Sequence, residues 1–167
     1  MLTTIWFTGL PCSGKTTLAR MLKEELERRG YPTVHLDGDD VRGGLNRDLG
    51  FSEEDRKENL RRVAHVARVL NQNGFTVIAS FISPTNEMRE MVREIIGSVK
   101  LIYLKCSLGE CERRDKKGMY ERARKGEIPE FTGISSPYEE PKADITVDTE
   151  GRDVRECIGE ILEELKL

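Results

Sequence analysis

Short, wholly apolar runs alternate along the chain with longer segments in which apolar residues recur every three or four positions. The first pattern is typical of strands buried on both faces, and the second is typical of helices that cover a sheet. Strands are expected at residues 4–8, 33–36, 75–79, 99–104 and 145–147. Because strands alternate with helices, the pattern predicts an α/β fold with a doubly wound, parallel, five-stranded sheet and helices on both faces.

Local signals place the helices between these strands. Helices are expected at residues 15–29, 52–72, 84–97, 110–114 and 153–165. Gly30 and Gly74 would end the first two, and Ser52 is a good N-cap for the second. Residues 115–142 are rich in charge, glycine and proline and hold little sustained apolar pattern, so this segment is expected to be a mobile excursion.

Length and charge narrow the class of protein. The 167 residues, 37% of them hydrophobic, suit one domain that spans residues 1–167. The net charge of −3 argues against nucleic acid or another polyanion as partner. Because the apolar runs are too short for a signal peptide or a membrane span, we expect a cytoplasmic protein with no membrane partner. The four cysteines form no CxxC pair, which favours reduced thiols over a zinc site.

The strongest chemical motif lies between the first expected strand and the first expected helix. Residues 9–16 read Gly-Leu-Pro-Cys-Ser-Gly-Lys-Thr and match G-x-x-x-x-G-K-[ST] in full. Glycines let successive N–H groups of such a loop point inward at phosphates. Lys15 would reach the β- and γ-phosphates, and the Thr16 hydroxyl would bind Mg²⁺. The expected ATP-binding residues here are Gly9, Leu10, Pro11, Cys12, Ser13, Gly14, Lys15, Thr16 and Thr17.

Three aspartates, Asp37, Asp39 and Asp40, follow the second expected strand. Strand carboxyl ends line the ligand crevice of a doubly wound sheet, so these carboxylates would lie near the phosphates. One could hold Mg²⁺ and another could orient an acceptor hydroxyl, although an Asp-Gly pair is also an ordinary turn. The chain shows no NKxD guanine motif, which disfavours a GTPase switch.

A cluster of cations surrounds the start of the 52–72 helix. Its members are Arg42, Arg56, Lys57, Arg61 and Arg62. Arg56 and Asn59 are three positions apart and therefore share a helix face. Acidic neighbours make a solvated surface the ordinary interpretation, and composition alone does not choose between that surface and an anion site.

Six stretches of sequence carry a more specific pattern. They are Leu-Asp-Gly-Asp-Asp-Val-Arg at 36–42, the run at 44–62, Ser-Phe-Ile-Ser-Pro at 80–84, Lys-Gly-Met-Tyr at 117–120, Ala-Arg-Lys-Gly-Glu-Ile at 123–128 and Phe-Thr-Gly-Ile-Ser-Ser-Pro-Tyr-Glu at 131–139. Together with the phosphate loop they closely resemble the adenylylsulfate kinase family of P-loop kinases. This resemblance covers nearly the whole chain. It implies transfer of the γ-phosphate of MgATP to the 3′-hydroxyl of adenosine 5′-phosphosulfate, which gives 3′-phosphoadenylyl sulfate and ADP.

The resemblance also implies roles for individual residues. The catalytic residues would be Lys15, Asp37, Asp39 and Ser83, with Thr16 and Asp37 as partners of Mg²⁺. The adenylylsulfate site would contain Asp39, Arg42, Phe51, Arg56, Asn59, Ile82, Ser83, Lys117 and Phe131, with the two phenylalanines on either side of the adenine. Arg113 and Arg114 would contact ATP, and residues 115–142 would form a lid whose closure excludes water.

Two of these roles have plainer interpretations. Ser83 matches a serine described in the family as a phosphoserine intermediate, but direct transfer needs no covalent relay, and the residue could simply cap a helix. Phe51 and Phe131 could be ordinary core residues.

The resemblance further implies a homodimer whose small-molecule partners are ATP and adenylylsulfate, with a separate ATP sulfurylase as functional partner. Two other functions stay open at the level of sequence. One is a kinase for a different small hydroxyl compound or nucleotide. The other is a nucleotide-binding regulator without transfer activity, which the intact Lys15, Thr16, Asp37 and Asp39 disfavour.

Overall fold

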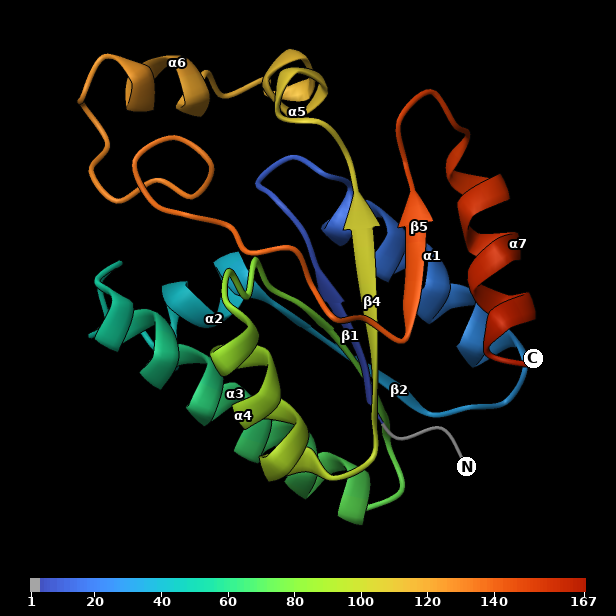
Figure 1. Cartoon of the computed structure of the whole chain (residues 1–167). Helices are drawn as coiled ribbons and strands as arrows, with labels where there is room; N and C mark the ends of the chain where they lie inside the picture. Colours follow the sequence, from blue (N-terminus) through green and yellow to red (C-terminus); the bar gives the residue numbers. More distant parts are fainter. Residues whose placement is uncertain (1–3) are drawn as a thin grey trace.

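The computed structural model describes residues 4–167, which form a five-stranded sheet with parallel pairing throughout (Figure 1). Residues 1–3, the start of the predicted domain, lie outside the described residues. The strands are β1 (Thr4–Thr8), β2 (Thr33–Asp37), β3 (Thr76–Ser80), β4 (Val99–Lys105) and β5 (Ile145–Asp148). Their order across the sheet is β2-β3-β1-β4-β5, which confirms the predicted doubly wound fold.

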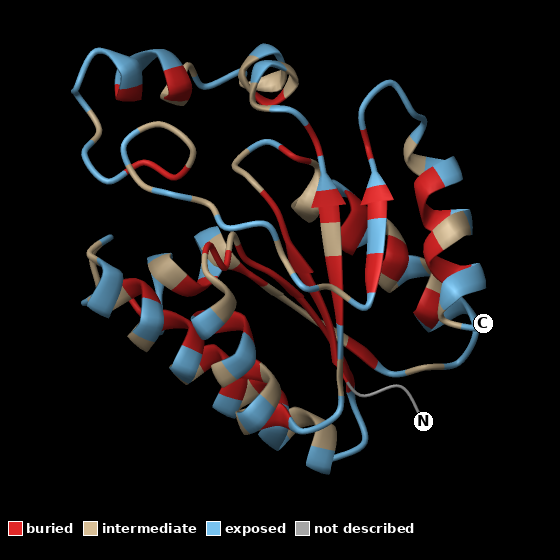
Figure 2. Ribbon diagram, viewed as in Figure 1, coloured by how far each residue is buried: buried red, intermediate tan, exposed pale blue. Residues whose placement is uncertain are grey.

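Helices cover both faces of this sheet. They are α1 (Lys15–Arg28), α2 (Gly38–Gly43), α3 (Glu53–Gln72), α4 (Asn86–Ile96), α5 (Leu108–Arg114), α6 (Met119–Arg124) and α7 (Val154–Glu164). In Figure 1, α1 and α7 lie on one face and α3 and α4 on the other. The central strands are therefore buried on both sides, as the burial colours in Figure 2 show, and this explains why their sequences are continuously apolar.

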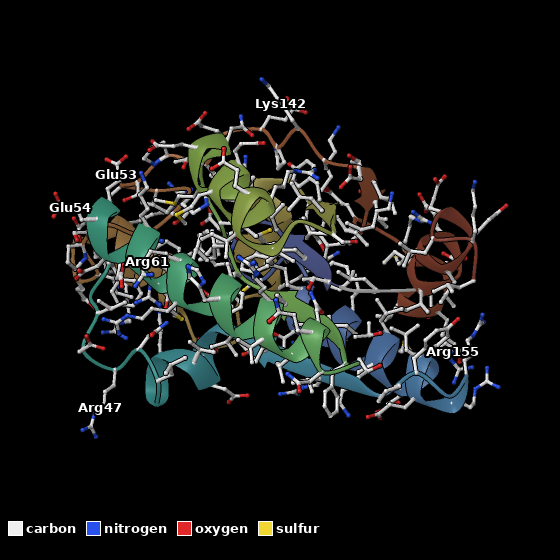
Figure 3. The ribbon with its side chains drawn as sticks, turned by 90° about the horizontal axis from the view of Figure 1, so that it is seen from below. Arg47, Glu53, Glu54, Arg61, Lys142 and Arg155 are labelled. Atoms are coloured by element: carbon white, nitrogen blue, oxygen red, sulfur yellow. The ribbon has the colours of Figure 1, made fainter. Side chains whose placement is uncertain are left out.

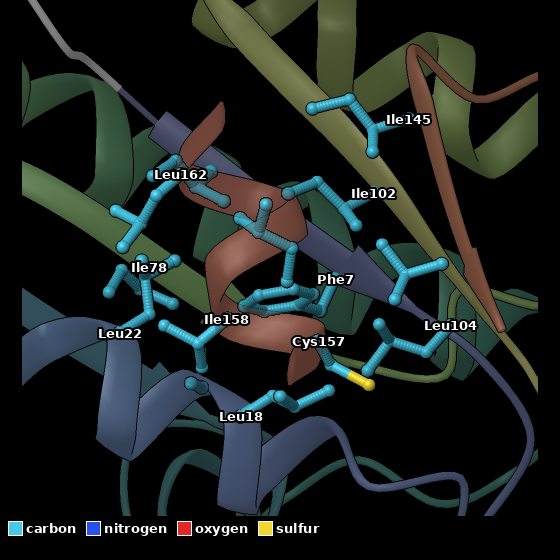
Figure 4. Close-up of a cluster of buried hydrophobic side chains, with 14 of the residues drawn as sticks. Phe7, Leu18, Leu22, Ile78, Ile102, Leu104, Ile145, Cys157, Ile158 and Leu162 are labelled. Atoms are coloured by element: carbon cyan, nitrogen blue, oxygen red, sulfur yellow. The ribbon is translucent and has the colours of Figure 1, made fainter. Parts of the chain in front are cut away.

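Each face has its own apolar core. Phe7 lies with Leu22 in the cluster under α1 and α7 (Figure 4), which also contains Ile161. Its neighbour Trp6 packs with Val63 in the cluster under α3 and α4. Adjacent residues of β1 thus point into opposite cores. All of these side chains are at most 1% exposed, so β1 is a rigid support for the loop that follows it.

The helix boundaries differ from the sequence prediction chiefly at α4. The predicted start was Pro84, with Ser83 as a candidate cap, but α4 begins at Asn86 and the side chain of Thr85 accepts the capping bond from Met88 N. Ser83 has a positive φ of 49° and a buried side chain. The interpretation of Ser83 as a helix cap is therefore wrong.

Two short helices, α2 and α6, were not predicted. Each has only six residues, too few for a periodic pattern to stand out. Helix α2 starts directly after β2 because the side chain of Asp37 accepts a bond from Asp39 N.

The segment 115–142 has more structure than its composition suggested. Helix α6 lies within it, and a small apolar cluster joins it to the end of β4 and to α5. The buried members of this cluster are Cys106, Cys111, Tyr120, Ala123 and Phe131. They are spread over 26 positions of sequence, so no local periodicity reveals them. We refer to residues 115–142 as the lid segment.

Candidate active site

Parallel pairing brings the carboxyl ends of the strands to one edge of the sheet. The phosphate loop (residues 9–16) follows β1, Asp37 ends β2, and Ile82 and Ser83 follow β3. Two cavities, of about 550 Å³ and about 470 Å³, open at this edge. Both are lined by Cys12, Lys15, Thr16 and Arg114. We call them the first and the second cavity.

The conformation of the phosphate loop depends on its glycines and on hydrogen bonds within the loop. Gly14 caps α1 with a φ of 99°, which a residue without a Cβ adopts at little cost. A Cβ on Gly9 would lie 2.5 Å from Ser13 Oγ, so this position also requires glycine. Lys15 Nζ donates to the carbonyl oxygens of Gly9 and Leu10, each at 2.8 Å. Desolvation lowers the pKa of Lys15 to about 8, because burial disfavours the charged ammonium. A bound anion would stabilise this ammonium and raise its pKa again.

Asp37 is the most strongly held carboxylate of the site. Thr16 Oγ1 and Ser80 Oγ both donate to its Oδ1 at 2.8 Å, and Asp39 N donates to its Oδ2 at 3.2 Å. Burial by itself raises the pKa of Asp37, but these hydrogen bonds outweigh burial and hold the pKa below its usual range. Asp37 is therefore an ionised carboxylate next to the phosphate-loop threonine. Asp39 is exposed and also lines the second cavity.

Arg42 and Arg56 both lie close to the ring of Phe51 in the second cavity. Their guanidinium carbons lie 4.3 Å and 5.6 Å from the ring centroid, and the phenylalanine is 52% exposed. Arg42 donates to Gly50 O, and Arg56 donates to Phe51 O and to two lid groups, Thr132 Oγ1 and Glu130 O. These acceptors are all neutral. Two cations thus share one small region without a bound carboxylate, which suits an anionic ligand.

The cationic cluster of the sequence is divided by the fold. Arg42 and Arg56 line the second cavity, whereas Lys57, Arg61 and Arg62 form ion pairs with Glu87, Glu58 and Asp48. In Figure 3, Arg61 is labelled on α3, on the same side of the view as Glu53 and Glu54. Surface charge is therefore the correct interpretation for three of the five cations.

All nine residues predicted for the adenylylsulfate site line the second cavity. They are Asp39, Arg42, Phe51, Arg56, Asn59, Ile82, Ser83, Lys117 and Phe131. Phe131 is 6% exposed and packs edge-on against Tyr120 at 4.9 Å, so it belongs to the lid core as well as to the cavity wall. Ser83 Oγ accepts a hydrogen bond from Trp6 Nε1 at 2.8 Å and donates one to Phe81 O at 3.2 Å.

The residues predicted for ATP binding separate into two groups. Cys12, Ser13, Gly14, Lys15, Thr16, Thr17 and Arg114 line the first cavity. Gly9, Leu10 and Arg113 do not line it, and Pro11 lines only the second. The side chain of Arg113 is 75% exposed and pairs with Glu110, whereas Arg114 donates to the carbonyl of Thr149 at 2.8 Å.

Sequence reasoning missed the far wall of the first cavity, which Thr149, Arg152 and Val154 provide. The loop that follows β5 carries Thr149 and Arg152, and Val154 is the first residue of α7. The rule that ligands bind at the carboxyl ends of strands could have identified this loop, because β5 was predicted.

The sequence model of the family described as "Adenylylsulphate kinase" matches residues 1–148. The chain belongs to the adenylylsulfate kinase family. A curated relative named adenylyl-sulfate kinase, from Bacillus velezensis, is 51% identical over 165 residues, which are 97% of this chain and 84% of the relative. The family predicted from the sequence is thereby confirmed.

Solved structures of the family agree with this fold. The Mycobacterium tuberculosis APS kinase CysC in complex with AMPPNP and APS superimposes with a TM-score of 0.95 at 42% identity, over 99% of this chain and 98% of that one. The hexameric APS kinase from Thiobacillus denitrificans gives a TM-score of 0.74 at 30% identity, with 98% of this chain and 28% of that chain covered.

Two further properties of this adenylylsulfate kinase family member concern its helices and its possible metal ligands. None of the helices in residues 4–167 has the length and apolarity needed to span a bilayer. In the same part of the chain, His, Cys, Asp and Glu side chains form no group of three or more that could hold a metal ion by themselves. A cation at this site would need further ligands, such as phosphate oxygens.

Proposed function

We propose that this chain is an adenylylsulfate kinase that transfers the γ-phosphate of ATP to the 3′-hydroxyl of adenosine 5′-phosphosulfate, giving 3′-phosphoadenylyl sulfate and ADP. One observation carries the proposal: two cavities meet at Lys15 and Thr16, and one of them contains a pair of arginines without a carboxylate partner. This arrangement suits two anionic nucleotides that face each other across a phosphate loop. The Mycobacterium tuberculosis relative, described with AMPPNP and APS bound, supports it.

ATP occupies the first cavity in this proposal. The phosphate-loop amides and the N-terminus of α1 hold the β-phosphate, and Lys15 leaves its two carbonyl partners for the β- and γ-phosphates. Arg114 lies where it can contact the nucleotide, whereas we assign Arg113 to the protein surface.

Adenylylsulfate occupies the second cavity. Arg42 and Arg56 bind its phosphosulfate oxygens, and Phe51 and Phe131 flank its adenine, with Asn59, Ile82 and Lys117 as further contacts. Asp37 or Asp39 orients the 3′-hydroxyl and accepts its proton during transfer. Closing of the lid segment over both nucleotides excludes water as a competing acceptor.

The donor set at Thr16 and Asp37 fits Mg²⁺. A hydroxyl and an ionised carboxylate, 2.8 Å apart, are hard oxygen ligands of the kind that this cation prefers. Thr16 and Asp37 would hold Mg²⁺ together with the nucleotide phosphates. When bound, Mg²⁺ would neutralise charge on the phosphates.

We also propose one domain for the whole chain, a homodimer, a cytoplasmic location and cooperation with a separate ATP sulfurylase. The proposed homodimer is testable by light scattering of the purified protein. Nucleic acid and membranes are not proposed as partners.

The test is a turnover assay with ATP and Mg²⁺ held constant and the acceptor varied among adenylylsulfate, AMP and other small hydroxyl compounds. Formation of 3′-phosphoadenylyl sulfate, with adenylylsulfate preferred over AMP, is the expected result. Folded protein that binds ATP but uses AMP better would identify a different nucleotide kinase. Binding of ATP without any turnover would identify a regulator.

A further inference from the structure

Behind Asp37 lie two polar side chains to which the sequence analysis gave no role. Ser80 is the direct neighbour of Asp37 in the β2–β3 pairing, and His35 lies two residues earlier on β2. Ser80 is 3% exposed, and the side chain of His35 is 10% exposed. His35 Nε2 lies 2.7 Å from Ser80 Oγ and 3.8 Å from Asp37 Oδ1. The three residues therefore form a buried row that ends at the carboxylate.

The hydrogen bonds of this row have a fixed direction. An ionised carboxylate only accepts, so Ser80 uses its single hydroxyl proton for Asp37 Oδ1. The 2.7 Å contact with His35 Nε2 then requires the histidine N–H as donor to Ser80 Oγ. The order is His35 to Ser80 to Asp37. In this arrangement His35 orients the serine hydroxyl, and the serine hydroxyl orients the carboxylate.

Ser80 differs from the other hydroxyl on Asp37 in one respect. Thr16, which also donates to Oδ1, belongs to the phosphate loop and is expected to take part in nucleotide and cation binding. Ser80 belongs to β3 and its partners are protein groups. It is the side-chain donor that can stay on Oδ1 whatever the loop binds. Oδ2 has one backbone donor and keeps lone pairs for a further ligand.

From this geometry we propose that Ser80 is a positioning residue for Asp37 in phosphoryl transfer, and that His35 acts only through Ser80. The inference rests on the proposed kinase function. It assigns the row a role in the chemical step rather than in nucleotide binding, because Ser80 fixes the orientation of a carboxylate that the reaction needs and contributes no charge of its own.

Kinetics of five variants test the proposal. Ser80→Ala removes the donor to Asp37, and we expect kcat to fall by about tenfold or more while KM for both nucleotides stays within about threefold. His35→Leu should lower kcat by about threefold. His35→Gln should stay within about twofold of the wild type, because a glutamine amide can replace Nε2–H as donor. The double variant Ser80→Ala/His35→Leu should be no slower than Ser80→Ala, since the effects of linked residues do not add.

The fifth variant, Thr76→Val, is a matched control. It removes a hydroxyl from a 3% exposed residue at the opposite end of β3, and its kcat should equal that of the wild type. Thermal melts of all variants are recorded alongside. If Ser80→Ala does not fold, the two His35 variants decide the question by themselves.

The outcomes separate the two proposals. A wild-type chain that does not phosphorylate adenylylsulfate contradicts the proposed function, and the variants are then compared on the acceptor that the chain does use or on ATP hydrolysis. Turnover in the wild type with an unchanged kcat in Ser80→Ala overturns the positioning role alone. A kcat in His35→Gln as low as in His35→Leu, or additive losses in the double variant, overturns the order of the row.

Discussion

Arg56 contacts both the lid segment and the second cavity. It belongs to α3, but its guanidinium donates to Thr132 Oγ1 and Glu130 O of the lid segment. It also lies 5.6 Å from the Phe51 ring in the second cavity. A single side chain thus connects the proposed acceptor site to the segment that covers it, and its guanidinium can make both sets of contacts because it has five donors.

Arg56→Ala should therefore raise KM for adenylylsulfate by about ten- to a hundredfold, because charge-assisted bonds to an anion contribute about 1.5–3 kcal/mol each. KM for ATP should change by less than about threefold. Steady-state kinetics with each substrate varied in turn give both values. The control is Lys57→Ala, which removes the neighbouring, exposed cation that pairs with Glu87. Equal losses for both substrates would contradict the role of Arg56.

For Ser83 the question is whether its hydroxyl takes part in phosphoryl transfer, because this hydroxyl already forms a hydrogen bond within the protein. It accepts the indole N–H of Trp6, and the serine is 2% exposed. Ser83→Ala should therefore keep at least about a tenth of kcat, as direct transfer does not need the hydroxyl, and should lose about 1–3 kcal/mol of stability through the unpaired indole N–H. Kinetics and a thermal melt measure the two effects.

Trp6→Phe removes the other half of this bond and serves as the comparison for stability. Loss of all turnover in a folded Ser83→Ala variant, together with phosphoserine at position 83 in mass spectra of the wild type, would support a covalent intermediate instead.

At the scale of single residues, the sequence was most informative where a motif fixes the backbone. The phosphate loop follows β1, as predicted, and all nine residues predicted for the adenylylsulfate site line the second cavity. Arg113 and Arg114 are adjacent, and no sequence rule says which of the two faces the cavity from a helix of seven residues. The contacts of Ser80 and His35 with Asp37 were not predicted. They depend on the register of β2 and β3, which a single sequence does not reveal.

Among the elements, α4 contributes an unusual buried cation. Arg89 is 2% exposed, and its guanidinium donates to Ser83 O, Asn86 Oδ1 and Glu139 O. Its Cζ also lies 5.0 Å from the centroid of the Tyr138 ring. The side chain thereby ties the loop after β3 to the trailing part of the lid segment, and every acceptor is neutral. The charge is stabilised by hydrogen bonds and by the aromatic face rather than by an ion pair.

Arg89→Leu should lower the free energy of unfolding by about 2–4 kcal/mol, because it removes three hydrogen bonds that a buried guanidinium donates to Ser83 O, Asn86 Oδ1 and Glu139 O. Chemical denaturation measures the loss. Arg93→Leu is the matched control one helical turn later: Arg93 is partly exposed and pairs with Asp144, so its removal should cost less than about 1 kcal/mol. Similar losses in the two variants would show that burial of Arg89 is not what matters.

The elements were predictable to the extent that they are periodic or capped. Strand β1 begins and ends at the predicted residues, and the predicted N-cap Ser52 does cap α3. Helix α4 starts later than predicted because Thr85 competes with Ser83 for the cap, and the backbone of Ser83 is held in a positive-φ conformation. Such competition depends on tertiary contacts, here the bond from Trp6.

At the scale of the whole molecule, one contact couples the lid segment to the phosphate loop. Tyr120 of α6 is 1% exposed, and its hydroxyl donates to Pro11 O at 2.7 Å. The lid core and the loop that is proposed to hold ATP are therefore in direct contact. Movement of one changes the environment of the other.

Tyr120→Phe should raise KM for ATP by about three- to tenfold and lower stability by about 1 kcal/mol, because one hydrogen bond between lid and loop is lost. It should also increase cleavage of the lid segment by trypsin, for which the segment offers many lysines and arginines. Tyr31→Phe, on the α1 side of the sheet, is the control and should change neither property. Unchanged KM and proteolysis in Tyr120→Phe would show that this bond does not couple the two parts.

The overall fold followed from the alternation of apolar strands and helices, but the organisation of the lid segment did not. Its core depends on Tyr120 and Phe131, which meet edge-on although eleven positions separate them. Contacts of this kind arise from tertiary packing. The amino-acid composition of the lid segment indicates only that the segment is rich in charge, so it does not predict this core.

Trp6 is the only tryptophan of the chain, and its indole reaches the proposed acceptor pocket through Ser83 while its ring stacks on Phe81 at 5.3 Å. The protein thus carries its single tryptophan directly behind that pocket, in contact with two residues that line it, Ser83 and Phe81. Stopped-flow emission, excited at 295 nm, would then follow arrival of the sulfated nucleotide on the millisecond scale, without a label and independently of turnover.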